Sequence, residues 1–175
     1  FDDEVPDRAL LRSLVREGDV ATAYSLYQRI AGADATDAVG AWSSDYPPFD
    51  WSLTDDAGLR AQPSLSGKGL EISVKPGKGG VVARRLMRAP ATPFAIAVDH
   101  TIERQQALQD IDITVRCAGQ SDEILNANLV RQNGGYRIDS LPDECSFIEI
   151  GLEARAWSGR SALNEEIEAI RVVRR

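Results

Sequence analysis

The chain has 175 residues, 43% of them hydrophobic, which is enough for one β-domain of ordinary size with a small appendage and argues against two full domains. Its 27 acidic residues outnumber its 20 lysines and arginines, and the net charge of −7 argues against a nucleic-acid partner, whose phosphates need a positive surface. No apolar run approaches the ~20 residues that span a bilayer, so no membrane-spanning segment is predicted.

Residues 1–33 have the pattern of a helical hairpin. Pro6 starts the first helix and Gly18 ends it. Asp19 can then cap a second helix, which ends near Gly32. The apolar residues at helical spacing are Leu10, Leu11, Leu14 and Val15 in the first helix, and Val20, Ala23, Tyr24, Tyr27 and Ile30 in the second.

The second helix resembles a tetratricopeptide-type helix, and the likeness covers at most one repeat. The residues that carry it are Gly18, Asp19, Ala21, Ala23, Tyr24 and Tyr27. Because a single repeat cannot bury its own apolar face, the hairpin is expected either to pack on the β-domain or to end a longer repeat array. Both alternatives make it an adaptor toward other parts of a longer protein. The sequence begins at Phe1 without a methionine, which also suggests a trimmed segment.

Residues 34–66 are rich in Ala, Asp, Ser, Pro and Gly, which predicts an irregular entry into the β-domain. The pair Pro47-Pro48 is incompatible with a regular strand or helix. A first strand is predicted over 49–53, with Trp51 in the core because it alternates with its apolar neighbours. A short second strand is predicted over 59–62.

From Gly69 onward, apolar residues fall at every second position, the period of a strand with one buried face. The predicted strands are 70–74, 81–87, 94–98, 111–117, 124–131, 135–141, 145–154 and 167–173, with a break at 78–80 and a turn at Asn133-Gly134. No helix pattern interrupts them. The fold class predicted for residues 34–175 is therefore mainly β, an antiparallel sandwich of two sheets.

Residues 42–173 resemble a galactose-binding-domain-like jelly roll, a group that includes many carbohydrate-binding modules. The segments that carry the resemblance are 48–51, 69–74, 84–90 and 166–173. The resemblance implies an often extracytoplasmic jelly-roll sandwich, with glycans bound by loops at one end or on a concave face. It also implies that some members bind nothing and act as structural spacers.

The two cysteines, Cys117 and Cys145, both fall at predicted strand ends, where neighbouring strands can be bridged, and a disulfide between them is predicted. A disulfide would favour an oxidising compartment, either the periplasm or the cell exterior. The alternative is a pair of buried, reduced thiols in a cytosolic protein.

No stretch of the chain carries a catalytic signature, so the protein is predicted not to be an enzyme. His100 is the only histidine, and a single imidazole without an orienting partner is expected to be a structural residue at a sheet end. Three acidic pairs could bind calcium or act as a glycosidase pair, although such pairs are usually solvated, so no cofactor is assigned. These pairs are Asp55 with Asp56, Asp110 with Asp112, and Glu165 with Glu166.

Aromatic residues in irregular segments are the better indication of binding, because sugars stack on rings and bond to planar polar groups. Trp157 lies in a predicted loop between Arg155 and Arg160, whose guanidinium groups would favour a carboxylated saccharide. Trp42 and Tyr46 could contribute from the entry segment. The alternatives are that Trp157 plugs an open end of the sandwich and that Trp42 packs the hairpin onto it.

Two functions therefore remain open. The first is a non-catalytic module that binds a saccharide or supports a surface polysaccharide assembly. The alternative is a structural interaction module of a larger repeat-containing protein, docked through the helical hairpin. An exposed Trp157 beside an arginine favours the first function, whereas three buried tryptophans favour the second.

Overall fold

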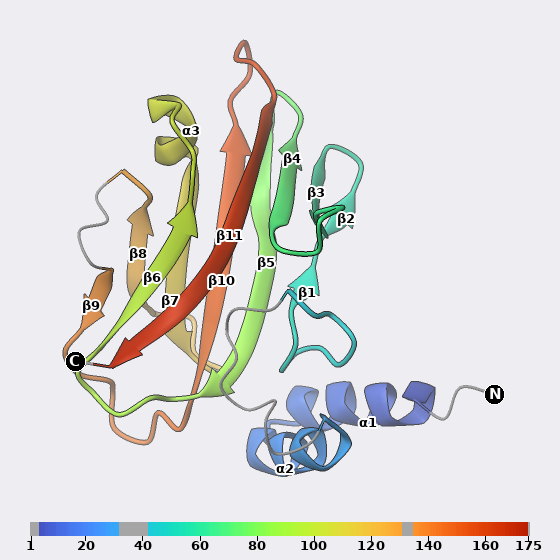
Figure 1. Ribbon diagram of the computed structural model, residues 1–175. Helices are drawn as coiled ribbons and strands as arrows, with labels where there is room; N and C mark the ends of the chain where they lie inside the picture. Colours follow the sequence, from blue (N-terminus) through green and yellow to red (C-terminus); the bar gives the residue numbers. More distant parts are fainter. Residues whose placement is uncertain (1–3, 32–41, 131–134, 175) are drawn as a thin grey trace.

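The computed structural model describes residues 4–31, 42–130 and 135–174. Two helices, α1 (Glu4–Arg16) and α2 (Val20–Ala31), precede a sandwich of two antiparallel sheets (Figure 1). This is the mainly β sandwich that the sequence predicts. Among the described helices, none is long and apolar enough to cross a membrane.

The two sheets have five and six strands. The five-stranded sheet, called sheet A, has the order β1 (Ser52–Leu53), β5 (Lys78–Arg88), β10 (Phe147–Ala156), β7 (Ile111–Cys117) and β8 (Glu123–Asn128). The six-stranded sheet B has the order β2 (Asp55–Asp56), β3 (Leu59–Pro63), β4 (Leu70–Val74), β11 (Leu163–Arg174), β6 (Phe94–His100) and β9 (Tyr136–Ile138). From β4 to β7, successive strands alternate between the sheets.

The sandwich core is built by the alternation seen in the sequence. In β10, Ile148, Ile150 and Leu152 point to one side and are fully buried. Their antiparallel partners Val115 and Ile113 in β7 are buried on the same side. Sheet B contributes its own buried alternating residues, including Leu70, Ile72, Val74, Ile96 and Val98. Trp51 is fully buried in this core, as predicted.

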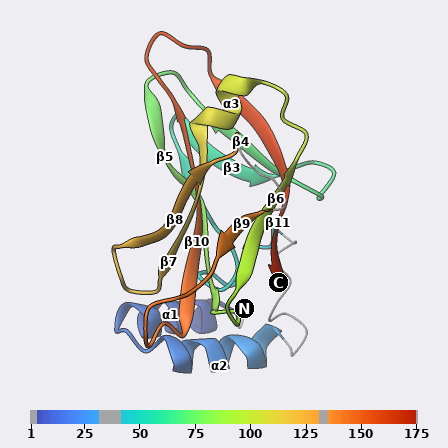
Figure 2. The same ribbon diagram turned by 90° about the vertical axis from the view of Figure 1, so that its left-hand side faces the viewer.

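The helical hairpin closes one end of the sandwich (Figures 1 and 2). Gly18 adopts a φ of +87°, the left-handed conformation that ends α1, and the Thr22 N–H donates to Asp19 Oδ1 at 3.3 Å to cap α2. The tyrosines of α2 then pack against the β-domain. This second core, called the hairpin cluster, consists of Leu11, Ala23, Tyr24, Tyr27, Phe49 and Leu86, with Phe147 packed against it.

Polar bonds hold the segment that joins the hairpin to the sheets. The Tyr27 hydroxyl donates to Asp50 Oδ1 at 2.8 Å, and the Tyr46 N–H donates to Asp50 Oδ2 at 2.9 Å. From β5, the buried Arg85 Nε donates to the Phe49 carbonyl at 2.6 Å. Burial and the bond to Asp50 raise the pKa of Tyr27 above its ordinary value. The hairpin therefore packs on the β-domain, the first of the two expected alternatives.

Cys117 and Cys145 form a disulfide, as predicted, with their Cα atoms 5.7 Å apart. The bond ties the end of β7 to the segment just before β10. Next to it, the Ala118 N–H donates to the Phe147 carbonyl at 2.9 Å. The Phe147 ring also lies 5.3 Å from that of Tyr24, so the disulfide supports the same end of the sandwich that the hairpin covers.

The local structure differs from the prediction in several places: β9 is shorter than the predicted strand 135–141, β11 begins four residues before the predicted 167, and β2 was not predicted. Three further differences have a clear physical reason. Residues Gln105–Asp110 form a short helix, α3, where only strands were expected, because six residues are too few to show helical periodicity. The predicted break at 78–80 is the start of β5, next to a register shift opposite β10. The first strand is only Ser52–Leu53, because the Asp50 N–H bonds back to the Tyr46 carbonyl instead of a neighbouring strand. The predicted Asn133-Gly134 turn lies outside the described residues.

We expect Tyr27→Phe to lower the free energy of unfolding by about 1 to 2 kcal/mol, because the part-buried Asp50 carboxylate would lose its hydroxyl donor. Urea unfolding measures this change. Ser25→Ala, an exposed substitution on the same helix, is the control and should stay within about 0.5 kcal/mol of the parent protein. Equal effects of the two substitutions would contradict the role assigned to the Tyr27 hydroxyl.

We expect the purified protein to carry the Cys117–Cys145 bond. Its mass under non-reducing conditions should be lower by two hydrogen atoms than after reduction. Reduction should lower the free energy of unfolding by about 3 to 4 kcal/mol, since the bond closes a loop with a sequence separation of 28. A free-thiol mass for protein isolated without reductant would rule the bond out.

Candidate functional site

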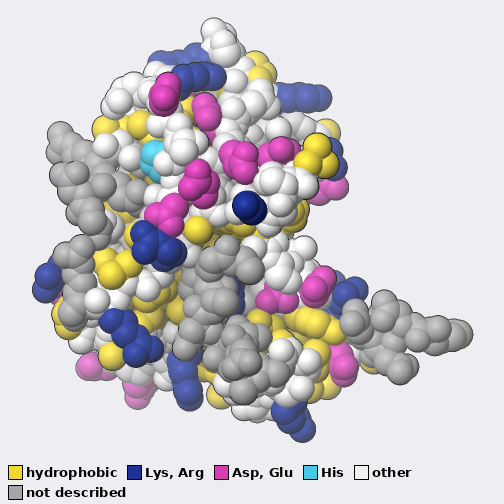
Figure 3. All heavy atoms as spheres, in the orientation of Figure 1, with side chains coloured by type: hydrophobic (Ala, Val, Ile, Leu, Met, Phe, Trp, Pro, Cys, Tyr) yellow, Lys and Arg dark blue, Asp and Glu magenta, His cyan; other side chains and the backbone are white. Residues whose placement is uncertain are grey.

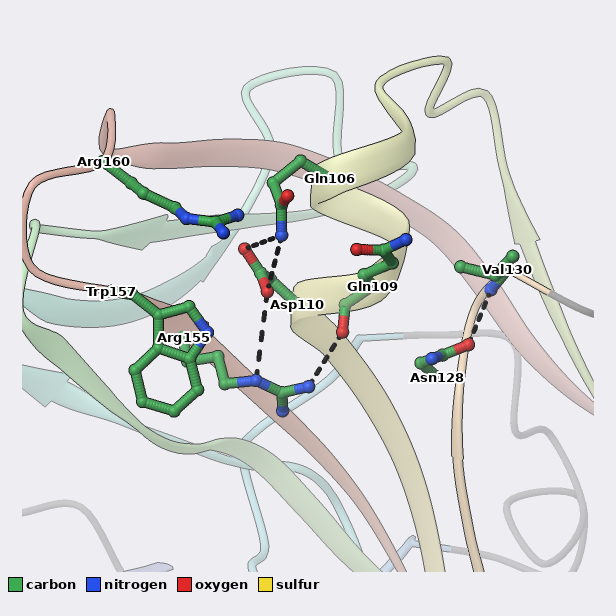
Figure 4. Close-up of a pocket in the computed structure, with 8 residues that line it drawn as sticks. All are labelled: Gln106, Gln109, Asp110, Asn128, Val130, Arg155, Trp157 and Arg160. Carbon is green, nitrogen blue, oxygen red and sulfur yellow. Dashed lines mark hydrogen bonds and ion pairs between the residues drawn. The ribbon is translucent and has the colours of Figure 1, made fainter.

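A pocket of about 670 Å³ lies at the end of the sandwich opposite the helical hairpin. Three parts of the chain meet there: α3, the end of β8, and the loop that joins β10 to β11 (Figures 1 and 4). The residues that line it are Gln106, Gln109, Asp110, Asn128, Val130, Arg155, Trp157 and Arg160. The predicted ligand residues Trp157, Arg155 and Arg160 are therefore brought together.

Trp157 is the exposed ring of this pocket, with 55% of its surface accessible to solvent. It follows directly after β10, and the Arg160 N–H donates to its carbonyl at 3.1 Å, which closes a tight turn. Gly159 in that turn has a φ of +83°, a conformation that suits glycine. The ring is therefore not a buried plug of the sandwich end, which was the alternative expectation for Trp157.

Arg155 is held by the protein itself. Its Nη1 donates to Asp112 Oδ2 at 2.7 Å and its Nη2 donates to the Gln109 carbonyl at 2.8 Å. The bond to Asp112 raises the pKa of the guanidinium further above its ordinary value. The guanidinium carbon lies 5.8 Å from the centre of the Trp157 ring, so Arg155 supports the ring by a cation–π contact. Arg155 is thus a positioning residue, and its guanidinium group is already bonded to the Asp112 carboxylate.

Arg160 is the exposed cation of the pocket. Among the described residues, its guanidinium has no ion-pair partner. In Figure 4 its side chain extends toward Gln106 across the mouth of the pocket. A carboxylate on a ligand would therefore meet Arg160 and not Arg155.

The helix α3 supplies the polar wall. Gln106 and Asp110 are one turn apart, and the Gln106 amide donates to both carboxylate oxygens of Asp110 at 3.2 Å. Arg155 Nε lies 3.9 Å from the same carboxylate, which is itself buried. The Leu129 N–H donates to the Leu108 carbonyl at 3.0 Å and ties the end of β8 to the helix. The wall is therefore ordered by bonds within the protein.

Asn128 lies on the opposite side and is anchored through its backbone. The Tyr136 hydroxyl donates to the Asn128 carbonyl at 2.6 Å, and the Asn128 side-chain oxygen accepts from the Val130 N–H at 3.1 Å. No described residue accepts a bond from the two side-chain N–H donors of Asn128, which are available for other partners. Burial, and to a lesser degree the nearby Asp112, raise the pKa of Tyr136 to about 12.

The structure does not bring Trp42 or Tyr46 to this pocket. Trp42 is 6% exposed, its ring lies 4.7 Å from that of Trp51, and its indole nitrogen donates to the Glu168 carbonyl at 3.0 Å. It belongs to the sandwich core and does not pack the hairpin onto it. Tyr46 packs against the hairpin cluster, under the Arg8 guanidinium. Both were expected as ligand contacts because an irregular segment has no periodicity that separates buried from exposed rings.

The other candidates have structural surroundings. His100 ends β6, and its Nδ1 accepts from the Ile102 N–H at 3.1 Å, which fits the predicted sheet-end role. Asp55 pairs with Arg60, and Asp112 is bonded to Arg155. In the described ranges, no three acidic, histidine or cysteine side chains gather in a way that could hold a metal ion.

Gln106, Gln109 and Asn128 were missed by sequence reasoning. The first two lie on α3, whose run Gln105-Gln106-Ala107-Leu108 consists of good helix formers. This propensity was the available signal. Asn128 ends a predicted strand and has no local pattern that marks it.

No protein-family model matches the chain, and no curated protein does either. Among solved structures, the chain is similar to one described as the crystal structure of accessory secretory protein 1,2 and 3 in Streptococcus pneumoniae. The identity is 13%, the TM-score is 0.37, and the match covers 72% of this chain and 91% of that chain. A likeness of this degree supports no inference about function.

We expect stability to fall as the pH rises above 10, the ordinary pKa of tyrosine, toward 12. Tyr136 has a raised pKa in the folded state, so its contribution is complete below the pKa of the unfolded chain and is lost as the pH rises through about 12. Urea unfolding at several alkaline pH values should show a shallower loss for Tyr136→Phe than for the parent protein. Identical pH slopes would contradict the raised pKa.

Proposed function

We propose that this chain is a non-catalytic carbohydrate-binding module that holds a saccharide in the pocket beside Trp157. The observation that carries the proposal is the 55% exposure of the Trp157 ring at the rim of a concave, polar pocket. A large exposed ring loses unfavourable contact with water when an apolar face of a ligand covers it.

The chemistry of the pocket suits a sugar. The C–H face of a pyranose would stack on Trp157, while hydroxyl groups would bond to planar polar side chains around it. Gln106, Gln109 and Asn128 offer amide groups, which can donate and accept, and Arg160 offers a guanidinium that only donates. Their anchoring within the protein would limit the loss of side-chain freedom when the ligand binds.

The charged side chains of the pocket narrow the class of ligand. Arg155 neutralises Asp112 and lies close to Asp110, so a ligand would meet one exposed guanidinium, that of Arg160. We therefore propose a neutral saccharide, or one with a single carboxylate placed against Arg160. The preference for acidic saccharides expected from the sequence would rest on Arg160 without help from Arg155.

Two features support the resemblance to galactose-binding-domain-like jelly rolls. Successive strands from β4 to β7 alternate between the sheets, and the candidate site lies in loops at one end of the sandwich. The Cys117–Cys145 disulfide supports a periplasmic or extracellular location, where such bonds persist.

The second candidate function is a structural interaction module docked through the helical hairpin. It is favoured by Leu10 of α1, whose apolar side chain is 47% exposed. A partner that covers α1 would bury this residue. The tetratricopeptide-like repeat array expected from the sequence belongs to this alternative.

Trp157→Ala is the test of saccharide binding. A glycan array identifies a ligand for the parent protein, and titration calorimetry should then show at least about tenfold weaker binding by the variant, because the stacking surface is lost. Leu65→Ala removes a fully exposed apolar side chain outside the pocket, and this variant should bind normally. The free energy of unfolding of Trp157→Ala should stay within about 1 kcal/mol of the parent value.

Three results would count against the proposal. These are the absence of any glycan ligand, unchanged binding by Trp157→Ala, and a loss of about 3 kcal/mol or more in stability, which is typical of a buried aromatic residue. The structural interaction module would then be the better assignment.

A further inference from the structure

A second, smaller groove lies at the helical end of the molecule, between α1 and β5. It has a volume of about 310 Å³. Arg12 and Arg16 of α1 line one side, and Arg84 of β5 lines the other. These residues belong to elements far apart in the sequence, so their meeting depends on the packing of the hairpin against sheet A.

The three guanidinium groups are available to a ligand. All three side chains are exposed, and none forms an ion pair with another described residue. Arg12 and Arg16 are one helical turn apart, a spacing at which like charges repel and destabilise the helix. An anion placed between them would relieve this repulsion.

The positive groove contrasts with the charge of the whole chain. The net charge is −7, and Figure 3 shows acidic side chains gathered over sheet B, where β11 carries the exposed Glu166 and Glu168. One acidic residue, Glu149, lines the groove itself. Its carboxylate forms an ion pair with Arg116, whose Nε lies 3.9 Å away. The groove is thus a local positive site on an acidic protein.

Apolar side chains form much of the rest of the groove, together with Ser52 and the buried Arg85. Val15 of α1, the Pro47-Pro48 pair and Leu86 of β5 line it between the cations. Bonds on the β5 side hold this wall: the Leu86 N–H donates to the Pro48 carbonyl at 2.8 Å, and Arg85 donates to the Phe49 carbonyl. The groove is therefore preformed, with an apolar floor and charged rims.

We propose that this groove binds an acidic segment of a partner polypeptide. Asp or Glu carboxylates would be held by the forked guanidinium groups of Arg12, Arg16 and Arg84, and aliphatic parts of the segment would cover the apolar floor. Among the described residues that line the groove there is no aromatic ring on which a sugar could stack. The net charge of −7 disfavours a nucleic acid or an anionic membrane, which present a much larger negative surface than this groove can neutralise.

The test uses a short fluorescein-labelled peptide that alternates Glu with Ala, and the same peptide with Gln in place of Glu. Fluorescence anisotropy should show saturable binding of the Glu peptide that weakens as salt is added, and at least about tenfold weaker binding of the Gln peptide. Arg12→Glu and Arg84→Glu, which lie on different elements, should each weaken binding of the Glu peptide by about tenfold.

Arg29→Glu is the matched control. It makes the same charge change on an exposed arginine of α2 that does not line the groove, and binding should change by less than about twofold. Thermal melting establishes that each variant is folded. A peptide that carries Lys in place of Glu should bind the double variant Arg12→Glu/Arg84→Glu better than the parent protein.

Several outcomes would overturn the proposal. Equal weakening by Arg29→Glu would show that only the overall charge matters. Tighter binding of a heparin oligosaccharide or of phosphatidylserine vesicles than of the Glu peptide would identify a different class of ligand. Absence of saturable binding to the Glu peptide would also reject the proposed site. None of these outcomes bears on Trp157, because the two sites lie at opposite ends of the sandwich.

Discussion

The carboxylate of Asp50 links the two hydrophobic cores of this protein. It accepts bonds from the Tyr27 hydroxyl and the Tyr46 backbone, and so fixes a short irregular segment just before β1. The two residues beside it then serve different cores, since Phe49 packs in the hairpin cluster and Trp51 packs in the sandwich. The groove between α1 and β5 also depends on this carboxylate, because the segment that the carboxylate fixes forms one wall of the groove.

The sequence was most informative where its pattern was repetitive. Alternation over β4, β7 and β10 predicted both the strands and their buried faces, because each such position meets the same core. It failed for α3, which is too short to show a period, and for Trp42, whose burial depends on contacts with Trp51 and the backbone of Glu168. Such contacts join residues far apart in the chain and leave no local signal.

The candidate site shows the same division. Trp157 and its two arginines were recognised from their closeness in sequence, and the exposure of the ring agrees with that interpretation. The different states of the two arginines could not be predicted, because Asp112 reaches Arg155 from a neighbouring strand while Arg160 lies beyond the sheet. Local composition therefore indicated the candidate site, whereas tertiary pairing decides which of its groups would remain available to a ligand.

The position of β11 has a consequence for how the chain acquires its fold. This last strand, Leu163–Arg174, lies between β4 and β6, and β10 lies between β5 and β7. Neither sheet can therefore be completed before β10 and β11 have joined it. Before that, the apolar faces of β4 to β7 have no complete partner and are open to aggregation. Folding should thus depend on contacts between residues far apart in the chain, which should make it slow.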